Sequence, residues 1–236
     1  MVSGELAPAT LPPGLRVYAI GDVHGCAERL AALHARVQAD LLGWPAERAV
    51  LVHLGDYVDR GPDSAGVVDL LWAPAVPGVE VVNLLGNHEQ MMLDALHPRA
   101  SGEQVQFWLE NGGAAALESY GADPGDPATW LAVPDEHLAT LASCRVSWRA
   151  GGYFFAHAGV RPDVPLDRQD PDDLAWIREP FLSWPHGLEA VVVHGHTPTA
   201  APEVLAHRIG LDTGAVYGGP LTCAVLEGDR IGFLFA

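Results

Sequence analysis

The chain has 236 residues, 49% of them hydrophobic, which is enough apolar material for one large α/β domain. Its 30 acidic against 13 basic residues give a formal net charge of -17, and this excess of negative charge excludes nucleic acids and anionic membranes as partners. Three scattered cysteines exclude a disulfide framework and favour the cytoplasm, and no apolar run approaches the roughly 20 residues of a membrane span.

The first hundred or so residues alternate apolar runs with helical patterns. Residues 1–14 lack a basic or apolar leader pattern, so we expect a loose N-terminal tail before a single domain of residues 15–236. We predict strands at residues 17–20, 49–54 and 79–85, and helices at residues 27–39, 64–72 and 89–96. Such an alternation is typical of a largely parallel sheet with right-handed crossovers.

The pattern changes at about residue 101. Residues 101–143 contain short helical stretches broken by glycines and turn residues, which predicts a helical insertion on one flank of the sheet. Strands then return, the first two as a hairpin, and we predict them at residues 145–148, 153–156, 190–193, 208–211, 221–226 and 230–235. The order of elements predicts an α/β fold in which two mixed β-sheets pack together and are flanked by helices.

Six polar side chains follow the apolar runs at the points where the predicted strands end. They are the side chains of Asp22, His24, Asp56, Asn87, His157 and His196. Each alone would be read as an ordinary core or loop residue, but six together indicate one shared site, because ligands bind at the carboxyl ends of strands in open α/β sheets. Mixed imidazole and carboxylate donors suit Zn, Fe or Mn better than Ca or Mg.

The motifs GDVHG, GDYVDRG, GNHE, HAG and HGHT occur in this order, together with NGG, WIRE and DTGAVYGG. Over residues 17–227 the set resembles the bacterial PPP-type, lambda-phage-like serine/threonine protein phosphatases of the calcineurin-like metallophosphoesterase superfamily. The resemblance implies the metallophosphoesterase fold and a centre of two divalent metal ions, with Mn²⁺ expected and Fe or Zn as alternatives. It implies that one ion is held by Asp22, His24 and His196, and the other by Asn87 and His157, with Asp56 bridging them.

The resemblance also implies hydrolysis without a covalent phosphoenzyme. A hydroxide that bridges the two ions attacks phosphorus directly, and His88 protonates the leaving alkoxide as general acid. Asp59 is expected to hydrogen-bond His88 and to keep its imidazole protonated. Arg60 and Arg178 are expected to clamp phosphate oxygens with their planar guanidinium groups.

These residues leave three functions open. The leading hypothesis is hydrolysis of phosphoserine and phosphothreonine, and of phosphotyrosine as a further substrate, in phosphoproteins, phosphopeptides or small phosphorylated molecules. The alternative is a dinucleoside polyphosphate hydrolase acting on diadenosine tetraphosphate, although such enzymes tend to lack the pair that this chain has at Asp59 and Arg60. The third is an inactive binding module, and the complete set of ligand, acid and clamp residues argues against it. Neither the natural substrate nor the oligomeric state follows from the sequence.

Overall fold

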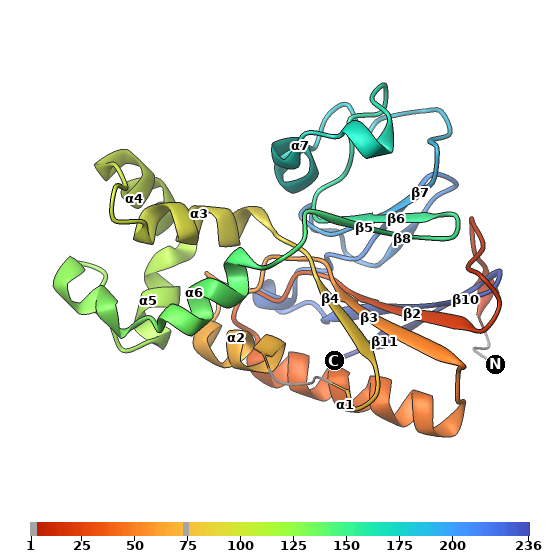
Figure 1. Ribbon diagram of the computed structural model, residues 1–236, viewed down its shortest axis with the longest axis horizontal. Coiled ribbons are helices and arrows are strands. Elements are labelled where there is room, and N and C mark those ends of the chain that lie inside the picture. The colour runs from red at the N-terminus through yellow and green to blue at the C-terminus, as the bar shows by residue number, and fades with distance from the viewer. Residues whose placement is uncertain (1–3, 73–75) are drawn as a thin grey trace.

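The computed structural model describes residues 4–72 and 76–236, and two β-sheets pack face to face within it (Figure 1). The six-stranded sheet has the order β1-β11-β10-β2-β3-β4. Its strands are β1 (Glu5–Leu6), β2 (Leu15–Ile20), β3 (Arg48–His53), β4 (Glu80–Asn83), β10 (Thr222–Glu227) and β11 (Arg230–Phe235). Because β2, β3 and β4 run parallel, their carboxyl ends meet at one edge of this sheet.

The five-stranded sheet has the order β5-β6-β7-β9-β8. Its strands are β5 (Ser147–Ala150), β6 (Tyr153–Ala156), β7 (Val191–His194), β8 (Glu203–Val204) and β9 (Arg208–Gly210). The strands β5 and β6 form the predicted antiparallel hairpin, whereas β6, β7 and β9 are parallel neighbours. Both sheets are therefore mixed, and the prediction of two packed mixed sheets is confirmed.

Helices cover the outer faces of the sheets and extend beyond one end (Figure 1). They are α1 (Ala27–Gly43), α2 (Ser64–Trp72), α3 (Asn87–Leu96), α4 (Gly102–Trp108), α5 (Ala114–Ser119), α6 (Asp135–Ala142) and α7 (Pro171–Trp176). The helices α4 to α6 make up the segment predicted as a helical insertion, and α5 and α6 contact α2. Within residues 4–72 and 76–236, no helix combines the length and the apolar character that a membrane crossing requires.

The central strand β2 shows how the core is divided. Its side chains alternate, so that Val17 and Ala19 pack between the two sheets while Tyr18 and Ile20 pack against the helices. All four are fully buried. The two apolar layers hold the strands in register, and this register fixes where the polar residues beyond the strand ends lie.

Most strand and helix ends differ from the sequence prediction by one to four residues, and two differences affect the N-terminal tail and the candidate site. Part of the expected loose tail is ordered, because Glu5–Leu6 pairs with β11 and the side chain of Leu11 is buried. Helix α3 begins at Asn87, two residues before the predicted start at Glu89. The Glu89 carboxylate reaches back and accepts a hydrogen bond from the Gly86 backbone N–H at 2.9 Å, which closes the first turn. Asn87 and His88 are consequently fixed on this turn.

A buried pair of histidines links the folding stability to pH. His53 Nδ1–H donates to Asn83 Oδ1 at 2.8 Å, so the neutral ring of His53 can only accept at Nε2, where His34 Nε2 lies 2.8 Å away and donates. Burial lowers the pKa of His34 to about 4 and that of His53 to about 3. Below pH 6.5 the unfolded chain therefore binds protons that the folded chain does not, and stability falls as the pH falls.

We expect the free energy of unfolding to decrease as the pH is lowered from 7.5 to 5.5. Each of the two histidines contributes at most about 1.4 kcal/mol per pH unit to this decrease. His34→Gln keeps a donor for His53 but removes one titrating ring, so this slope should become shallower. Urea unfolding at the two pH values measures the slope, and His186→Gln at an exposed position is the matched control. A slope equal to that of the wild type would show that His34 titrates normally in the folded protein.

Candidate metal centre

The six candidate ligands predicted from the sequence come together at one edge of the two sheets. Their side chains lie beyond the ends of β2, β3, β4, β6 and β7, and all six residues are buried: Asp22, His24, Asp56, Asn87, His157 and His196. The packing of the two sheets brings the ends of β6 and β7 against those of β2 and β3. His157 Nδ1, for example, lies 3.0 Å from the Leu54 carbonyl oxygen, and the His196 N–H donates to the Asp22 carboxylate at 3.0 Å.

Asp56 lies at the middle of this cluster. Its Oδ2 is 3.5 Å from His24 Nε2, and its Oδ1 is 3.2 Å from His157 Nε2. Each of these rings presents its Nδ1 to a backbone carbonyl, His24 to Val58 at 2.9 Å and His157 to Leu54 at 3.0 Å. These hydrogen bonds orient the Nε2 atoms toward the carboxylate, as outer hydrogen bonds orient metal-binding histidines.

Asn87 joins the two histidines that come from the second sheet. Its Oδ1 is 3.0 Å from His157 Nε2 and 2.9 Å from His196 Nδ1. Asp56, His157 and His196 also place donor atoms within 4.8 Å of one another. This proximity corrects the division of ligands that the resemblance implied, since His196 lies with Asn87 and His157 rather than with His24. Its backbone N–H alone contacts Asp22.

The donor set fits divalent cations. Among the described residues, two groups of three side chains have donor atoms that all lie within 4.8 Å of one another. One group contains His24 and His88, the other contains His157 and His196, and Asp56 belongs to both. His196 Nε2 is buried and has no hydrogen-bond partner within the described chain. A buried nitrogen with a free lone pair loses its interaction with water, and a metal ion compensates for that loss.

The pKa values of the acidic and histidine side chains in the cluster are strongly shifted. Burial, followed by the negative charge of Asp212, raises the pKa of Asp22 well above its usual range. Burial would also raise the pKa of Asp56, but His157, His88 and His24 together outweigh it and hold that pKa well below its usual range. In return Asp56 raises the pKa of His157 to about 9 although burial opposes this. Several buried carboxylates thus share one positive partner, and cations would relieve their mutual repulsion.

Backbone strain is concentrated at the same place. Five non-glycine residues in the described chain have positive φ angles, and all five belong to the predicted site: His24 at 42°, Asp56 at 52°, Asp59 at 71°, Arg60 at 67° and His196 at 64°. The left-handed region costs an L-residue roughly 1–2 kcal/mol. The surrounding core maintains these conformations, and strain of this kind gathers at functional sites.

His88 and Asp59 form a buried pair next to the ligands. His88 Nδ1 is 2.7 Å from Asp59 Oδ2, and Trp108 Nε1–H donates to Asp59 Oδ1 at 2.9 Å. Burial raises the pKa of Asp59 well above its usual range and lowers that of His88 to about 4. The sequence prediction that Asp59 contacts His88 is therefore reproduced by the geometry, whereas burial lowers the pKa of the imidazole instead of raising it.

Two arginines reach the cluster from its open side. Arg60 is exposed, and its Nη1 donates to His24 Nε2 at 2.6 Å. Arg178 is also exposed, and its charge contributes to lowering the pKa of His196, although burial is the larger cause. Both guanidinium groups thus lie near the buried donors while remaining accessible to a ligand from solvent.

Glu89 has a structural role to which the sequence prediction assigned nothing. Its buried carboxylate accepts backbone N–H groups of Gly86, Asp56, Tyr57 and Val58 at 2.9, 2.8, 2.7 and 3.2 Å. One side chain thereby holds the loop that carries Asp56 against the turn that carries Asn87. The signal in the sequence was the last letter of GNHE, and Asp212 likewise lies in a motif, DTGAVYGG, in which it received no role. Trp108 lies three residues before NGG, outside the named motifs.

Glu89→Gln should therefore destabilise the metal-free protein by about 2 kcal/mol, since an amide NH₂ would face backbone donors that now have an acceptor. The ends of β3 and β4 should loosen together. Urea unfolding of the metal-free protein measures the change, with Glu118→Gln at an exposed position of α5 as the control. Equal stability of the two variants would mean that the four hydrogen bonds do not hold the loop.

Comparisons with known proteins agree with this geometry. Serine/threonine-protein phosphatase 1 of Salmonella typhimurium is 32% identical over 222 residues, which cover 89% of this chain and 92% of that protein. The asymmetrical bis(5'-nucleosyl)-tetraphosphatase PrpE of a Geobacillus species is 27% identical, covering 88% and 89%. The crystal structure of a presumed diadenosine tetraphosphatase superposes with a TM-score of 0.67 at 26% identity, covering 97% of this chain and 98% of that one.

A family model extends over nearly the whole chain. The model described as calcineurin-like phosphoesterase matches residues 15–233, from the start of β2 to the last strand. The match includes the five-stranded sheet, the six-stranded sheet except β1 and the end of β11, the helical insertion and every candidate ligand. The membership expected from the motifs is therefore confirmed, and the chain is a phosphoester hydrolase of the calcineurin-like phosphoesterase family.

Proposed function

We propose that this chain is a cytoplasmic, metal-dependent phosphomonoesterase that dephosphorylates phosphoserine and phosphothreonine, and phosphotyrosine as well. The observation that carries the proposal is the position of Asp56, whose two oxygens face histidines on opposite sides at 3.5 and 3.2 Å. A carboxylate placed in this way can bridge two cations. We infer that Asp22 and His24 belong to one ion, that Asn87, His157 and His196 belong to the other, and that the native metal is Mn²⁺ with Fe or Zn as alternatives.

Two bound cations would activate a water molecule as nucleophile and offset the charge of the phosphate group. The residues of the chain supply the remaining functions. Arg60 and Arg178 bind phosphate oxygens and orient the ester, because a planar guanidinium can donate two parallel hydrogen bonds. Their exposure allows them to receive the substrate before it reaches the buried donors.

His88 supplies the proton for the leaving group. Its Nδ1 faces Asp59, so its Nε2 is the nitrogen available to a substrate oxygen. We infer that the Asp59 carboxyl is protonated and donates this proton in the hydrogen bond to Nδ1. The neutral imidazole then has its single N–H at Nε2, where it can be given to the leaving group. A dianionic phosphate bound by the arginines raises the pKa of the nearby imidazole from the low value that burial gives it. Trp108 fixes the Asp59 carboxylate from its other side at 2.9 Å, so the pair keeps its orientation during the reaction.

The alternative substrate, a dinucleoside polyphosphate, is suggested by the names of PrpE and of the superposed structure. Two features favour the phosphoprotein. Asp59 and Arg60 are both present and in position, and the higher identity is to the protein phosphatase. In addition, the cavity next to the site is rich in carboxylates, which repel a polyphosphate chain.

Phosphate release distinguishes the two substrates. Metal-free protein reloaded with Mn²⁺ should hydrolyse a phosphothreonine peptide with a higher kcat/KM than it cleaves diadenosine tetraphosphate. The Arg60→Lys variant should lose activity on both the peptide and para-nitrophenyl phosphate, because both carry the phosphate group and a lysine cannot make the paired contact with it. Preferential cleavage of the dinucleotide would overturn the proposed substrate, and no activity on either would indicate a binding module.

A further inference from the structure

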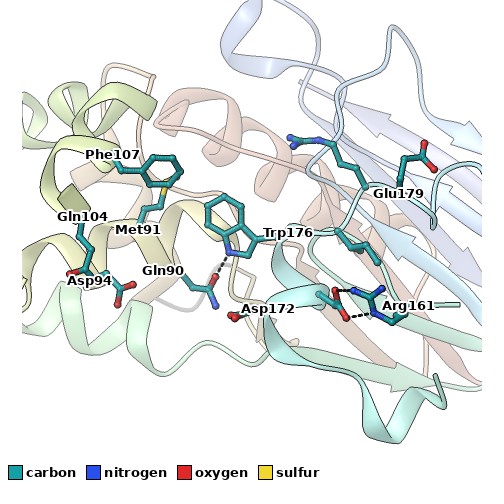
Figure 2. A pocket seen from close by; sticks show the side chains of 12 residues that line it. Gln90, Met91, Asp94, Gln104, Phe107, Arg161, Asp172, Trp176 and Glu179 are labelled. Carbon is teal, nitrogen blue, oxygen red and sulfur yellow. Dashed lines mark hydrogen bonds and ion pairs between the residues drawn. The ribbon is translucent and has the colours of Figure 1, made fainter. Parts of the chain in front are cut away.

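A cavity of about 810 Å³ lies between α3, α4 and α7 and extends to the loop that carries Arg178 (Figure 2). Its lining includes Gln90 and Met91, which follow the candidate site residues Asn87 and His88 on helix α3. The cavity thus reaches Arg178, one of the two arginines proposed to bind phosphate. Its volume is in the range of known ligand pockets and exceeds what a phosphate group needs.

One wall of this cavity is aromatic. Phe107 of α4 and Trp176 of α7 lie with ring centroids 6.3 Å apart and planes 31° apart, and Figure 2 shows the two rings side by side. Trp176 is held in place by a hydrogen bond from its Nε1–H to Gln90 Oε1 at 2.6 Å. Phe107 is 50% exposed, an unusual position for a large ring unless a ligand covers it. The faces of these rings attract cations.

The charged part of the lining consists of four carboxylates and the guanidinium groups of Arg161 and Arg178. Asp94, Asp172, Asp173 and Glu179 line the cavity, and of these Asp173 is paired with Arg161 at 2.6 Å. Asp94 and Asp172 are exposed and form no ion pair with any described residue. In Figure 2 both carboxylates lie on the same side of the two rings. The cavity therefore combines aromatic faces with negative charges that have no positive partner in the described chain.

We propose that this cavity receives an arginine side chain next to the phosphorylated residue of the substrate, and this inference rests on the proposed phosphoprotein phosphatase function. The guanidinium stacks on Phe107 and Trp176 and pairs with Asp94 and Asp172, while the phosphate lies between Arg60 and Arg178. Arginine fits better than lysine because its planar group can stack and form two parallel hydrogen bonds at once. The opposite charges of the two neighbouring subsites thus select a phosphorylated residue that has an arginine next to it in the substrate.

Three phosphothreonine peptides that differ only in the flanking residues test the proposal. With arginine, alanine or glutamate on both sides, kcat/KM at low salt should be about tenfold higher for arginine than for alanine, and lowest for glutamate. The double variant Asp94→Asn with Asp172→Asn should reduce the preference for arginine to about twofold, and Phe107→Leu should weaken it as well. The control, Glu118→Gln with Glu136→Gln, removes two exposed charges outside the cavity lining and should keep the preference.

Para-nitrophenyl phosphate separates this inference from the function on which it rests. This small ester does not reach the cavity, so its turnover should be the same in all variants. Equal kcat/KM for the three peptides, with normal turnover of the small ester, would overturn the arginine subsite alone. Cleavage of diadenosine tetraphosphate without hydrolysis of any peptide would overturn both the proposed function and the subsite.

Discussion

Replacing His88 by asparagine should lower kcat for a phosphothreonine peptide by about 10²–10⁴-fold while leaving the protein folded and its bound metal in place. The side chain of His88 is 1% exposed and its Nδ1 is bonded to Asp59, so only Nε2 can deliver a proton to the ester. Without that proton an alkoxide must leave as an anion. The loss should be much smaller for para-nitrophenyl phosphate, because the nitrophenolate is stable without protonation.

The difference between the two substrates is the informative result. A residue that merely supports the site would reduce the turnover of both esters to the same degree. His97→Asn, at an exposed position directly after α3, should leave both unchanged and serves as the control. Equal losses on the peptide and on the aryl ester in His88→Asn would contradict the general-acid role and would indicate that His88 acts as a ligand or a support.

Asp56→Asn is expected to have the second large effect, because it alters the group that both halves of the site share. The amide keeps one oxygen but replaces the other with an NH₂ that cannot bind a cation. Loss of a residue that only hydrogen-bonds a metal ligand lowers metal affinity by up to about 100-fold. Because Asp56 is proposed to bind the ions directly, we expect a larger loss of metal affinity, and peptide turnover should fall with it. Metal content by mass spectrometry and kcat at saturating Mn²⁺ measure the two quantities.

A control for this variant lies in the same loop. Asp63→Asn changes an exposed carboxylate seven positions further along, whose Oδ1 accepts the Gly66 N–H, and asparagine can accept the same bond. This variant should keep two ions and full activity. An Asp56→Asn protein that still bound two ions per chain would show that the carboxylate does not bridge them.

The positions of strands and helices followed from the sequence where a local pattern determines them. The helix at residues 64–72 was predicted with the bounds that the structure shows, because its apolar residues recur at helical spacing between Pro62 and Pro74 in the sequence. Strand β1 was not predicted. Its pairing with β11 joins residues more than 200 positions apart, and a two-residue strand has no period to detect.

The composition of the candidate site could be predicted, but its electrostatics could not. The motifs identified the residues, and the structure brings all of them to one edge of the sheets. Which histidine lies beside Asn87 depends on how the two sheets pack, and this corrected the position of His196. The pKa of His88 depends on burial, which the sequence does not display, and burial lowers this pKa although the negative charge of Asp56 opposes it.

The two-metal centre is tested most directly by measuring the number of bound metal ions and the phosphatase activity in one titration. Metal-free protein is titrated with Mn²⁺, and bound ions per chain and phosphate release from a phosphothreonine peptide are recorded at each step. We expect two ions to bind per chain. Turnover should rise as the second ion binds, because the Asp56 carboxylate is proposed to bridge the two ions. Phosphate release by the metal-free protein, or full turnover with one ion per chain, would contradict the two-metal centre.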